Sequence, residues 1–423
     1  MRTLQLGMAG NDIMEIQALL KKMGYNIVKV NGSYDENTEE AVKLFQRDHN
    51  LEADGIIDKR TYQQLEPYLL GYTLYTIKNG DNLYRLAIRF HSSVEQILTA
   101  NPYLKPNRLV VGERIFIPFS FNVVDTNINY TYDAMERDYR GLQVRYPFIE
   151  TGVAGRSVLN RNLYYIRLGN GPHQVFYNAA HHALEWITSP VLMKFVEDFS
   201  RAYARGEMLA GYNPRDIWKK SSIYLIPMVN PDGVDLVLNG LSPDNPYYND
   251  LIKWNKGSSD FSTVWQANIH GVDLNHNYDA AWDESVKAAA QLGITGPAPR
   301  RYPGPYPESE PESHSLVVFT KSHDFRLTLS YHAQGEVIFW NFMGLADERA
   351  KRIGEQLARD SGYKLEEAIG IASTGGYKDW FIMEYRRPAY TVEVGKGQTP
   401  LPISQFDKIY ADNIKMLMHA AII

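Results

Sequence analysis

Hydrophobic side chains recur every three or four positions near the start of the chain. Ile13, Ile16 and Leu19 follow this spacing, which is typical of an amphipathic helix. Further on, an Asx-Gly-x-x-Asp-x-x-Thr pattern occurs at residues 31–38 and again 23 residues later (54 − 31). The Asx-Gly pair favours a tight turn, and the aspartate favours the first turn of a helix. The pattern therefore predicts three small helices around one core over residues 1–70.

The next part of the chain combines short strands with short helices. Strand-like runs at residues 75–77 and 114–118 enclose two helical patterns, the first capped by Asp81 and the second starting at Ser92 or Ser93. The predicted order is strand, helix, helix, strand. After the second strand few apolar positions are periodic, so we expect a linker there.

Strand-like apolar runs alternate with helical patterns from Tyr130 to the end of the chain, over 294 residues (423 − 129). The clearest runs are residues 163–166, 175–177 and 223–226. A helical pattern at residues 191–199 lies between two of them, as a crossover between parallel strands requires. This alternation predicts an α/β domain.

The composition limits the partners and metal ligands open to this chain. It has 44 basic and 49 acidic residues and a net charge of −5, so we expect no nucleic-acid partner. No apolar run approaches the roughly 18 residues of a membrane helix, and we expect no membrane partner. The absence of cysteine excludes thiolate metal sites and cysteine nucleophiles. Histidine and carboxylate side chains remain as the strong metal ligands.

Histidine and glutamate residues lie at or near the ends of three strand-like runs. His182 and Glu185 follow one run at a spacing of three, a pair that by itself also occurs as a buried histidine bonded to a carboxylate. His332 ends a second run, and Glu393 lies within a third, where acidic residues are uncommon without a function. Two histidines and one glutamate with a free fourth position form a ligand set of catalytic zinc. His181 has the wrong spacing for this set, and we interpret it as structural or as supporting the ligands.

Seven motifs occur in one order after residue 130, and together they resemble the zinc carboxypeptidase (funnelin) family. They are His182-x-x-Glu185, Asn230-Pro231-Asp232-Gly233, Gly271-Val272-Asp273-Leu274-Asn275, Ser309-Glu310-Pro311-Glu312, Ser330-Tyr331-His332, Gly375-Gly376-x-x-Asp379-Trp380 and Thr391-Val392-Glu393. The resemblance implies a mixed, twisted sheet of about eight strands flanked by helices, with the site at the carboxyl ends of the strands. It also implies one zinc ion held by His182, Glu185 and His332, and Glu393 as the general base that deprotonates the attacking water.

The N-terminal part of the chain resembles two cell-wall modules. The repeated turns with Phe45-Gln46 resemble the peptidoglycan-binding domain of bacterial wall hydrolases, and the following strands and helices, with Gly80-Asp81 and Ile117-Pro118, resemble the LysM domain. Both imply wall glycan strands as a partner. We therefore expect a multidomain chain: a peptidoglycan-binding domain at 1–70, a βααβ LysM domain at 72–118, a linker at 119–129 and a large α/β catalytic domain at 130–423.

The sequence departs from the family at positions that bind substrate. The arginine that clamps a terminal carboxylate is replaced by His276, beside the retained Asn275, and a neutral imidazole lacks the two-pronged fork of a guanidinium. Lys378 falls at the position that sets side-chain preference, which predicts an acidic side chain such as that of meso-diaminopimelate. The family's mobile tyrosine falls at Ile371, with Tyr377 as a candidate replacement. No arginine is found for the oxyanion, for which the candidate is Lys256.

These features together resemble the γ-D-glutamyl-L-diamino acid endopeptidase I group of the family. The resemblance implies a zinc peptidase that cuts between γ-D-glutamate and meso-diaminopimelate in peptidoglycan stem peptides. The alternatives are a metallocarboxypeptidase that removes acidic C-terminal residues and a non-catalytic protein that binds wall glycan. Asp12 and Glu15 interrupt the first apolar run, so we expect no secretory signal. The expected location is the cytoplasm of a bacterium, or its spore or cell wall.

Overall fold

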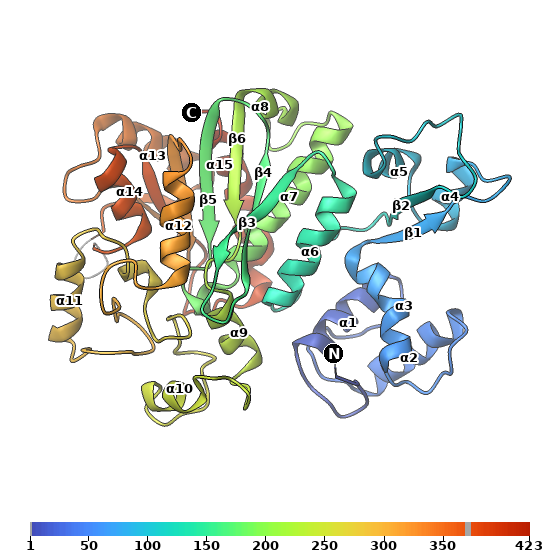
Figure 1. Ribbon diagram of the computed structural model, residues 1–423, viewed down its shortest axis with the longest axis horizontal. Helices are drawn as coiled ribbons and strands as arrows, with labels where there is room; N and C mark the ends of the chain where they lie inside the picture. Colours follow the sequence, from blue (N-terminus) through green and yellow to red (C-terminus); the bar gives the residue numbers. More distant parts are fainter. Residues whose placement is uncertain (1, 369–373) are drawn as a thin grey trace. The chain divides into compact units, whose positions relative to one another are not determined.

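The computed structural model describes residues 2–368 and 374–423, which form two compact units (Figure 1). One unit contains the residues up to Asn129 together with Asp133–Ile149, and the other contains Tyr130–Tyr132 and Glu150–Ile423. None of the helices within the described residues has the length and apolar character needed to cross a membrane. The domain boundaries drawn from the sequence stay predictions.

The chain begins with the three predicted helices, α1 (Asn11–Lys22), α2 (Glu36–Asp48) and α3 (Lys59–Leu70), around one apolar core. A buried glutamine from the preceding helix holds each repeated turn. Gln17 accepts a hydrogen bond from the backbone N of Gly32 at 2.9 Å, and Gln46 accepts one from the backbone N of Gly55 at 2.9 Å. Each glutamine also donates to the threonine that ends its repeat. The repeat in the sequence is therefore a repeat of one buried polar contact.

The predicted order of strand, helix, helix, strand is confirmed for the next segment. It consists of β1 (Tyr72–Thr76), α4 (Leu83–Arg89), α5 (Val94–Ala100) and β2 (Arg114–Pro118), and the two strands pair antiparallel.

Two details of this segment refine the sequence analysis. Asn82 caps α4, so the prediction that Asp81 caps it was wrong. The carboxylate of Asp81 instead closes the preceding turn by accepting from Lys78 N at 2.7 Å. Of the two serines considered for the start of α5, the cap is Ser93.

The segment predicted as a linker is packed against its own unit. Phe119 and Val123 are buried, and helix α6 (Tyr132–Arg145) follows them. The guanidinium of Arg145 donates to the backbone oxygens of Gly71 at 3.0 Å and Phe119 at 2.7 Å. Most of α6 therefore belongs to the N-terminal unit, although its sequence was grouped with the catalytic domain.

The second unit contains the mixed eight-stranded sheet that the sequence predicted. Its order is β3-β4-β6-β5-β7-β10-β8-β9, and β6, β5, β7 and β10 run parallel in its centre. Central strands are buried on both faces and therefore read as near-continuous apolar runs. The strands are β3 (Glu150–Arg156), β4 (Asn162–Leu168), β5 (His173–Ala179), β6 (Ser221–Ile226), β7 (Leu327–His332), β8 (Val337–Phe339), β9 (Lys364–Glu366) and β10 (Ala389–Glu393).

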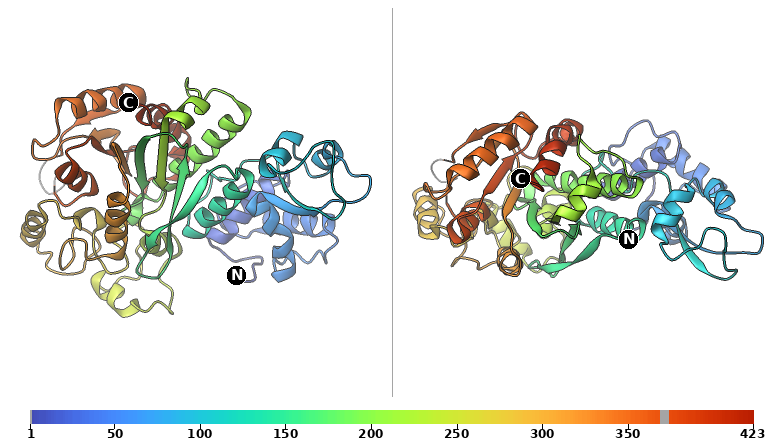
Figure 2. Two further views of the ribbon diagram at one scale, coloured as in Figure 1. Left: turned by 45° about the horizontal axis from the view of Figure 1, so that its top comes forward. Right: turned by 90° about the horizontal axis from the view of Figure 1, so that it is seen from above.

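Helices cover both faces of this sheet (Figure 2). The predicted crossover is α7 (Thr188–Arg205), which packs with α13 (Glu348–Ser361) and α15 (Phe406–Ala420) on one face, while α12 (Pro311–Lys321) and α14 (Tyr377–Tyr385) cover the other. The remaining helices are α8 (Pro214–Lys220), α9 (Pro231–Asn239), α10 (Tyr248–Trp254) and α11 (Trp282–Gln291), with short 3₁₀ turns at η1 (Ala183–Glu185), η2 (Leu274–His276) and η4 (Ile403–Gln405).

The register of the central strands places the candidate catalytic residues at one edge of the sheet. Glu393 at the end of β10 pairs with His332 at the end of β7, and residues in register on parallel strands point to the same face. Strand β5 ends beside them, because Ala179 pairs with Tyr331. The loop that follows β5, which carries His182 and Glu185, therefore leaves the sheet at the same edge.

Candidate metal centre

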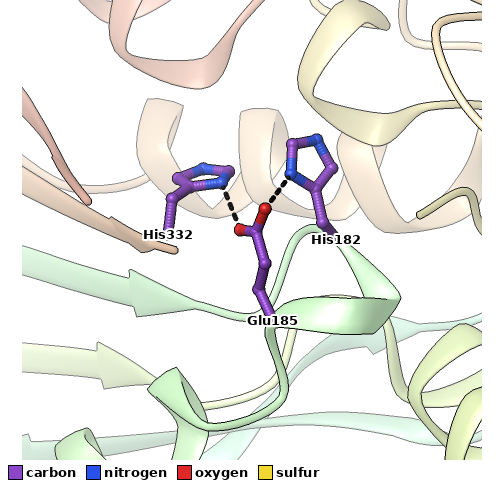
Figure 3. A group of neighbouring side chains, drawn as sticks. All are labelled: His182, Glu185 and His332. Atoms are coloured by element: carbon purple, nitrogen blue, oxygen red, sulfur yellow. Dashed lines mark hydrogen bonds and ion pairs between the residues drawn. The ribbon is translucent and has the colours of Figure 1, made fainter. Parts of the chain in front are cut away.

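Three side chains from distant parts of the sequence converge at the carboxyl edge of the sheet (Figure 3). The carboxylate of Glu185 lies between two imidazoles. Its Oε1 is 2.8 Å from His182 Nδ1, and its Oε2 is 2.9 Å from His332 Nδ1. The ligand atoms of the three residues all lie within 4.8 Å of one another. The structure thus brings together the set that the sequence analysis selected.

Hydrogen bonds hold the loop that presents His182 and Glu185. Ala180 has a left-handed backbone (φ 54°), which turns the chain out of β5. The side-chain amide of Asn230 donates to His181 O at 3.0 Å, and Ala183 N donates to Gln266 O at 3.0 Å. These contacts come from segments 49 and 83 positions further along the chain (230 − 181 and 266 − 183), so the loop's shape depends on the completed fold.

A second carboxylate, that of Asp273, binds the other ring nitrogen of His182. His182 Nε2 donates to Asp273 Oδ1 at 2.9 Å, and Asp273 Oδ2 accepts from Arg301 N at 2.8 Å. A carboxylate in this position fixes the imidazole tautomer and leaves the other nitrogen available for a metal. Asp273 lies within one of the family motifs but had no predicted role. The general pairing of metal-binding histidines with carboxylates was the signal that could have identified it.

The donor set and its electrostatics fit a zinc ion. Burial alone would raise the pKa of Glu185, but the neighbouring imidazoles of His182 and His332 lower it to about 2. Burial alone would lower the pKa of His182, but Glu185 and Asp273 raise it well above its ordinary value. The cluster therefore stabilises positive charge where the Nδ1 and carboxylate atoms converge. Two imidazoles and one carboxylate with a further open position are a donor set of catalytic zinc.

Glu393 lies beside this cluster, close enough to interact electrostatically with Glu185 and His182. Burial and the negative charge of Glu185 raise the pKa of the Glu393 carboxyl well above its ordinary value. A bound dication would add positive charge and lower that pKa again. A carboxylate tuned in this way is suited to accept a proton near neutral pH.

His181 has a different environment from its neighbour. Its ring is fully buried, stacks on His332 with centroids 5.4 Å apart, and lies 3.0 Å from the hydroxyl of Tyr278 through Nε2. Burial lowers the pKa of His181 well below its ordinary value, so the ring is neutral. This placement agrees with a structural role.

Four of the five predicted substrate-binding residues gather around the start of helix α14. Asn275 Oδ1 accepts from Tyr377 N at 3.1 Å, and His276 Nδ1 donates to Thr374 O at 3.0 Å. Asn275 and His276 belong to the η2 turn, which begins at Leu274, one residue after Asp273. One short segment therefore connects the metal cluster to the start of α14, which carries Lys378.

Lys378 and Tyr377 differ in what they offer to a substrate. The ammonium of Lys378 is buried, donates to Asn341 O at 2.8 Å and forms an ion pair with Asp379. The ring of Tyr377 is fully buried and its hydroxyl lies 2.8 Å from Thr320 Oγ1. This core position argues against Tyr377 as the mobile substrate tyrosine. Ile371, where the family places that residue, lies outside the described residues.

The structure does not support Lys256 as the oxyanion donor. Lys256 is exposed, lies two residues after the end of α10 and has a left-handed backbone (φ 56°), and no contact among the described residues links its side chain to the metal cluster. The backbone of Gln266, by contrast, contacts the metal loop directly, because its oxygen accepts a hydrogen bond from Ala183 N at 3.0 Å. The residue that stabilises the oxyanion was therefore not found by sequence reasoning.

Comparison with known families identifies three regions. Residues 135–416 match the family described as zinc carboxypeptidase, residues 9–65 match the putative peptidoglycan binding domain, and residues 75–118 match the LysM domain.

Relatives cover most of the chain. The sequence is 38% identical over 394 residues to "Gamma-D-glutamyl-L-diamino acid endopeptidase 1" of Lysinibacillus sphaericus, covering 81% of this chain and 98% of that protein. It is 37% identical over 286 residues to "Uncharacterized protein YqgT" of Bacillus subtilis (strain 168), covering 66% of this chain and 74% of that protein. The solved carboxypeptidase A from Helicoverpa armigera shares the fold, with a TM-score of 0.51, 15% identity and coverage of 99% of this chain and 97% of that one.

Replacing Asp273 with asparagine tests the support of the metal site. We expect Asp273→Asn to keep all three ligands but to lower zinc affinity about 10- to 100-fold, because the imidazole of His182 loses its charged partner. Competition with a chelator of known affinity measures the change. Asp279→Asn, at an exposed position of the same segment, is the matched control. Equal affinities in the two variants would contradict the role of Asp273.

The response of thermal stability to zinc should depend on pH. The raised pKa of His182 means that its proton stabilises the metal-free fold below the ordinary histidine pKa of about 6.5, and that this stabilisation is lost as the pH rises through the raised value. Zinc requires the same nitrogen without its proton. We therefore expect the zinc-induced increase in Tm to be larger near pH 8.5 than near pH 6. Glu185 stays ionised throughout, since its pKa is about 2. A zinc-induced increase in Tm that does not change with pH would refute the competition between zinc and the proton of His182.

Proposed function

The chain belongs to the zinc carboxypeptidase family, and from this premise we propose that it hydrolyses the bond between γ-D-glutamate and meso-diaminopimelate in peptidoglycan stem peptides. The observation that carries the proposal is the 38% identity across 98% of a relative named for this class of bond. The chain also contains putative peptidoglycan-binding and LysM domains. Both modules direct the enzyme to wall material.

The metal cluster is suited to hydrolysis without a covalent intermediate. His182, Glu185 and His332 would hold the zinc ion, which when bound supplies a Lewis acid that polarises a carbonyl and makes water more acidic. Glu393, in register with His332 at the strand end, would take the proton from the attacking water and pass it to the leaving amine. Asp273 would keep the ring of His182 in place throughout.

The residue at the carboxylate-clamp position favours cleavage inside a peptide. His276 occupies that position, and its Nδ1 is already used in donating to Thr374 O. A single imidazole cannot make the paired hydrogen bonds by which arginine binds a terminal carboxylate. The enzyme therefore has less need of a free C-terminus next to the cut, and the stem peptide can continue beyond diaminopimelate.

The environment of Lys378 favours diaminopimelate over an ordinary acidic residue. The buried Lys378–Asp379 pair carries no net charge. The far end of meso-diaminopimelate carries both an ammonium group and a carboxylate, so it can face such a pair without leaving a charge unbalanced. An aspartate or glutamate side chain would add one uncompensated negative charge, which is costly in a buried site.

The test is to incubate zinc-loaded protein with L-Ala-γ-D-Glu-meso-diaminopimelate-D-Ala and to identify the products by mass spectrometry, with a chelator control. We expect chelator-sensitive release of L-Ala-D-Glu. Release of the terminal D-Ala alone would instead assign a carboxypeptidase. An intact substrate would favour the non-catalytic protein that binds wall glycan.

Glu393→Gln is the catalytic control within this assay. We expect the variant to bind zinc as the native protein does and to lose about 10²- to 10⁴-fold in kcat, because an amide cannot accept the proton. Zinc content by atomic absorption and product formation are measured on the same sample. Undiminished turnover would remove Glu393 as the base.

Lys378→Met tests the specificity position. We expect kcat/KM to fall about tenfold or more for the diaminopimelate substrate relative to the same peptide with lysine in its place, since a charged hydrogen bond is lost. Lys351→Met, at an exposed position of α13, is the control. Thermal unfolding accompanies the assay, because the variant leaves buried Asp379 unpaired. An unchanged substrate ratio in a folded variant would rule out the assignment.

A further inference from the structure

The segment at residues 298–302 is tied closely to the metal loop. Pro299 O accepts from Gln266 N at 2.8 Å, and Tyr302 O accepts from Asp273 N at 2.7 Å. Gln266 in turn contacts the loop of His182 through its own backbone oxygen. The segment therefore has a fixed position beside the metal cluster, although it belongs to no helix or strand.

Arg301 lies in this segment, one side chain away from a metal residue. Its backbone N donates to Asp273 Oδ2 at 2.8 Å, while Asp273 Oδ1 accepts from His182 Nε2 at 2.9 Å. Its backbone is left-handed (φ 65°). A non-glycine residue in this region is uncommon, and such residues cluster at functional sites where the surroundings enforce them.

The guanidinium of Arg301 is available for a ligand. The residue is partly exposed, and within residues 2–368 and 374–423 its side chain forms no hydrogen bond or ion pair. Some other arginines of this unit are engaged, such as Arg161 with Asp235 at 2.7 Å and Arg387 with Asp324 at 2.7 Å. An unpaired arginine whose backbone is fixed to a partner of the metal residue His182 is suited to bind a carboxylate through two parallel hydrogen bonds.

The proposed substrate offers such a carboxylate on the acyl side of the cut. In a γ-D-glutamyl bond the α-carboxylate stays free, separated from the scissile carbonyl by only the Cα, Cβ and Cγ carbons. An ordinary α-linked peptide has no charge at this place. We propose that Arg301 binds the α-carboxylate of γ-D-glutamate and so selects γ-linked substrates, an inference that rests on the proposed function. Arg301 thereby determines specificity without taking part in the proton transfers.

The experiment pairs a protein variant with a change in the substrate. Initial rates at low concentration give kcat/KM for L-Ala-γ-D-Glu-meso-diaminopimelate and for the same peptide with the α-carboxylate converted to a carboxamide. We expect the native enzyme to prefer the carboxylate about 10- to 100-fold, the usual range for one charge-assisted contact. Arg301→Met should abolish this preference by lowering the rate on the carboxylate only. The backbone contact with Asp273 is not altered by the substitution.

Two further variants separate binding from structural effects. Arg300→Met, at the exposed neighbouring position, should keep the native preference. Arg301→Lys, which keeps the charge but loses the fork, should retain part of it. The assignment would be overturned if Arg301→Met lowered kcat/KM equally on both substrates. It would also be overturned if Arg300→Met, and not Arg301→Met, abolished the preference for the carboxylate.

The outcomes also separate this inference from the function on which it rests. A native enzyme that cleaves both peptides at equal rates would retain the proposed function and refute the role of Arg301. A native enzyme that cleaves neither would overturn both.

Discussion

The carboxylate of Glu185, buried between His182 and His332, is the interaction on which the rest of the site depends. A buried charge is tolerated only when its partners are close and correctly oriented. This requirement fixes the ends of β5 and β7 relative to each other, and it fixes the loop after β5. Asp273 accepts hydrogen bonds from His182 and from the backbone of Arg301. The positions of Arg301, Asn275 and His276 therefore depend on the same arrangement of charges. A metal ion held by these three residues would take the place of the hydrogen bonds between Glu185 and the two imidazoles.

The residues that we propose to bind substrate favour cleavage inside a peptide by a carboxypeptidase fold. An enzyme that cuts at a chain end can recognise the terminal carboxylate, whereas an endopeptidase must recognise groups that every internal site presents. In this chain the clamp position holds His276, the Lys378–Asp379 pair lies at the start of α14, and the backbone of Arg301 donates to Asp273. We infer that recognition shifts from the terminus to the side groups of the two residues joined by the cut bond.

The N-terminal unit contains the modules that match the putative peptidoglycan binding domain and the LysM domain. Its turns depend on buried amides rather than on exposed charge, since Gln17 and Gln46 each satisfy the backbone of an Asx-Gly turn. A module that binds wall glycan raises the local concentration of stem peptides for a catalytic domain on the same chain.

The sequence by itself determined the α/β class, the N-terminal modules and the choice of His182, Glu185 and His332 as candidate metal residues. These features are local: apolar periodicity, repeated turns, and histidines or glutamates placed where apolar runs end. Only the tertiary structure decided that Asp273 supports His182, that Lys378 is paired with Asp379, that Tyr377 lies in the core, and that most of α6 packs with the N-terminal unit. Each of these depends on partners brought together by folding or on which way a side chain points, and neither is encoded in the spacing of residues along the chain.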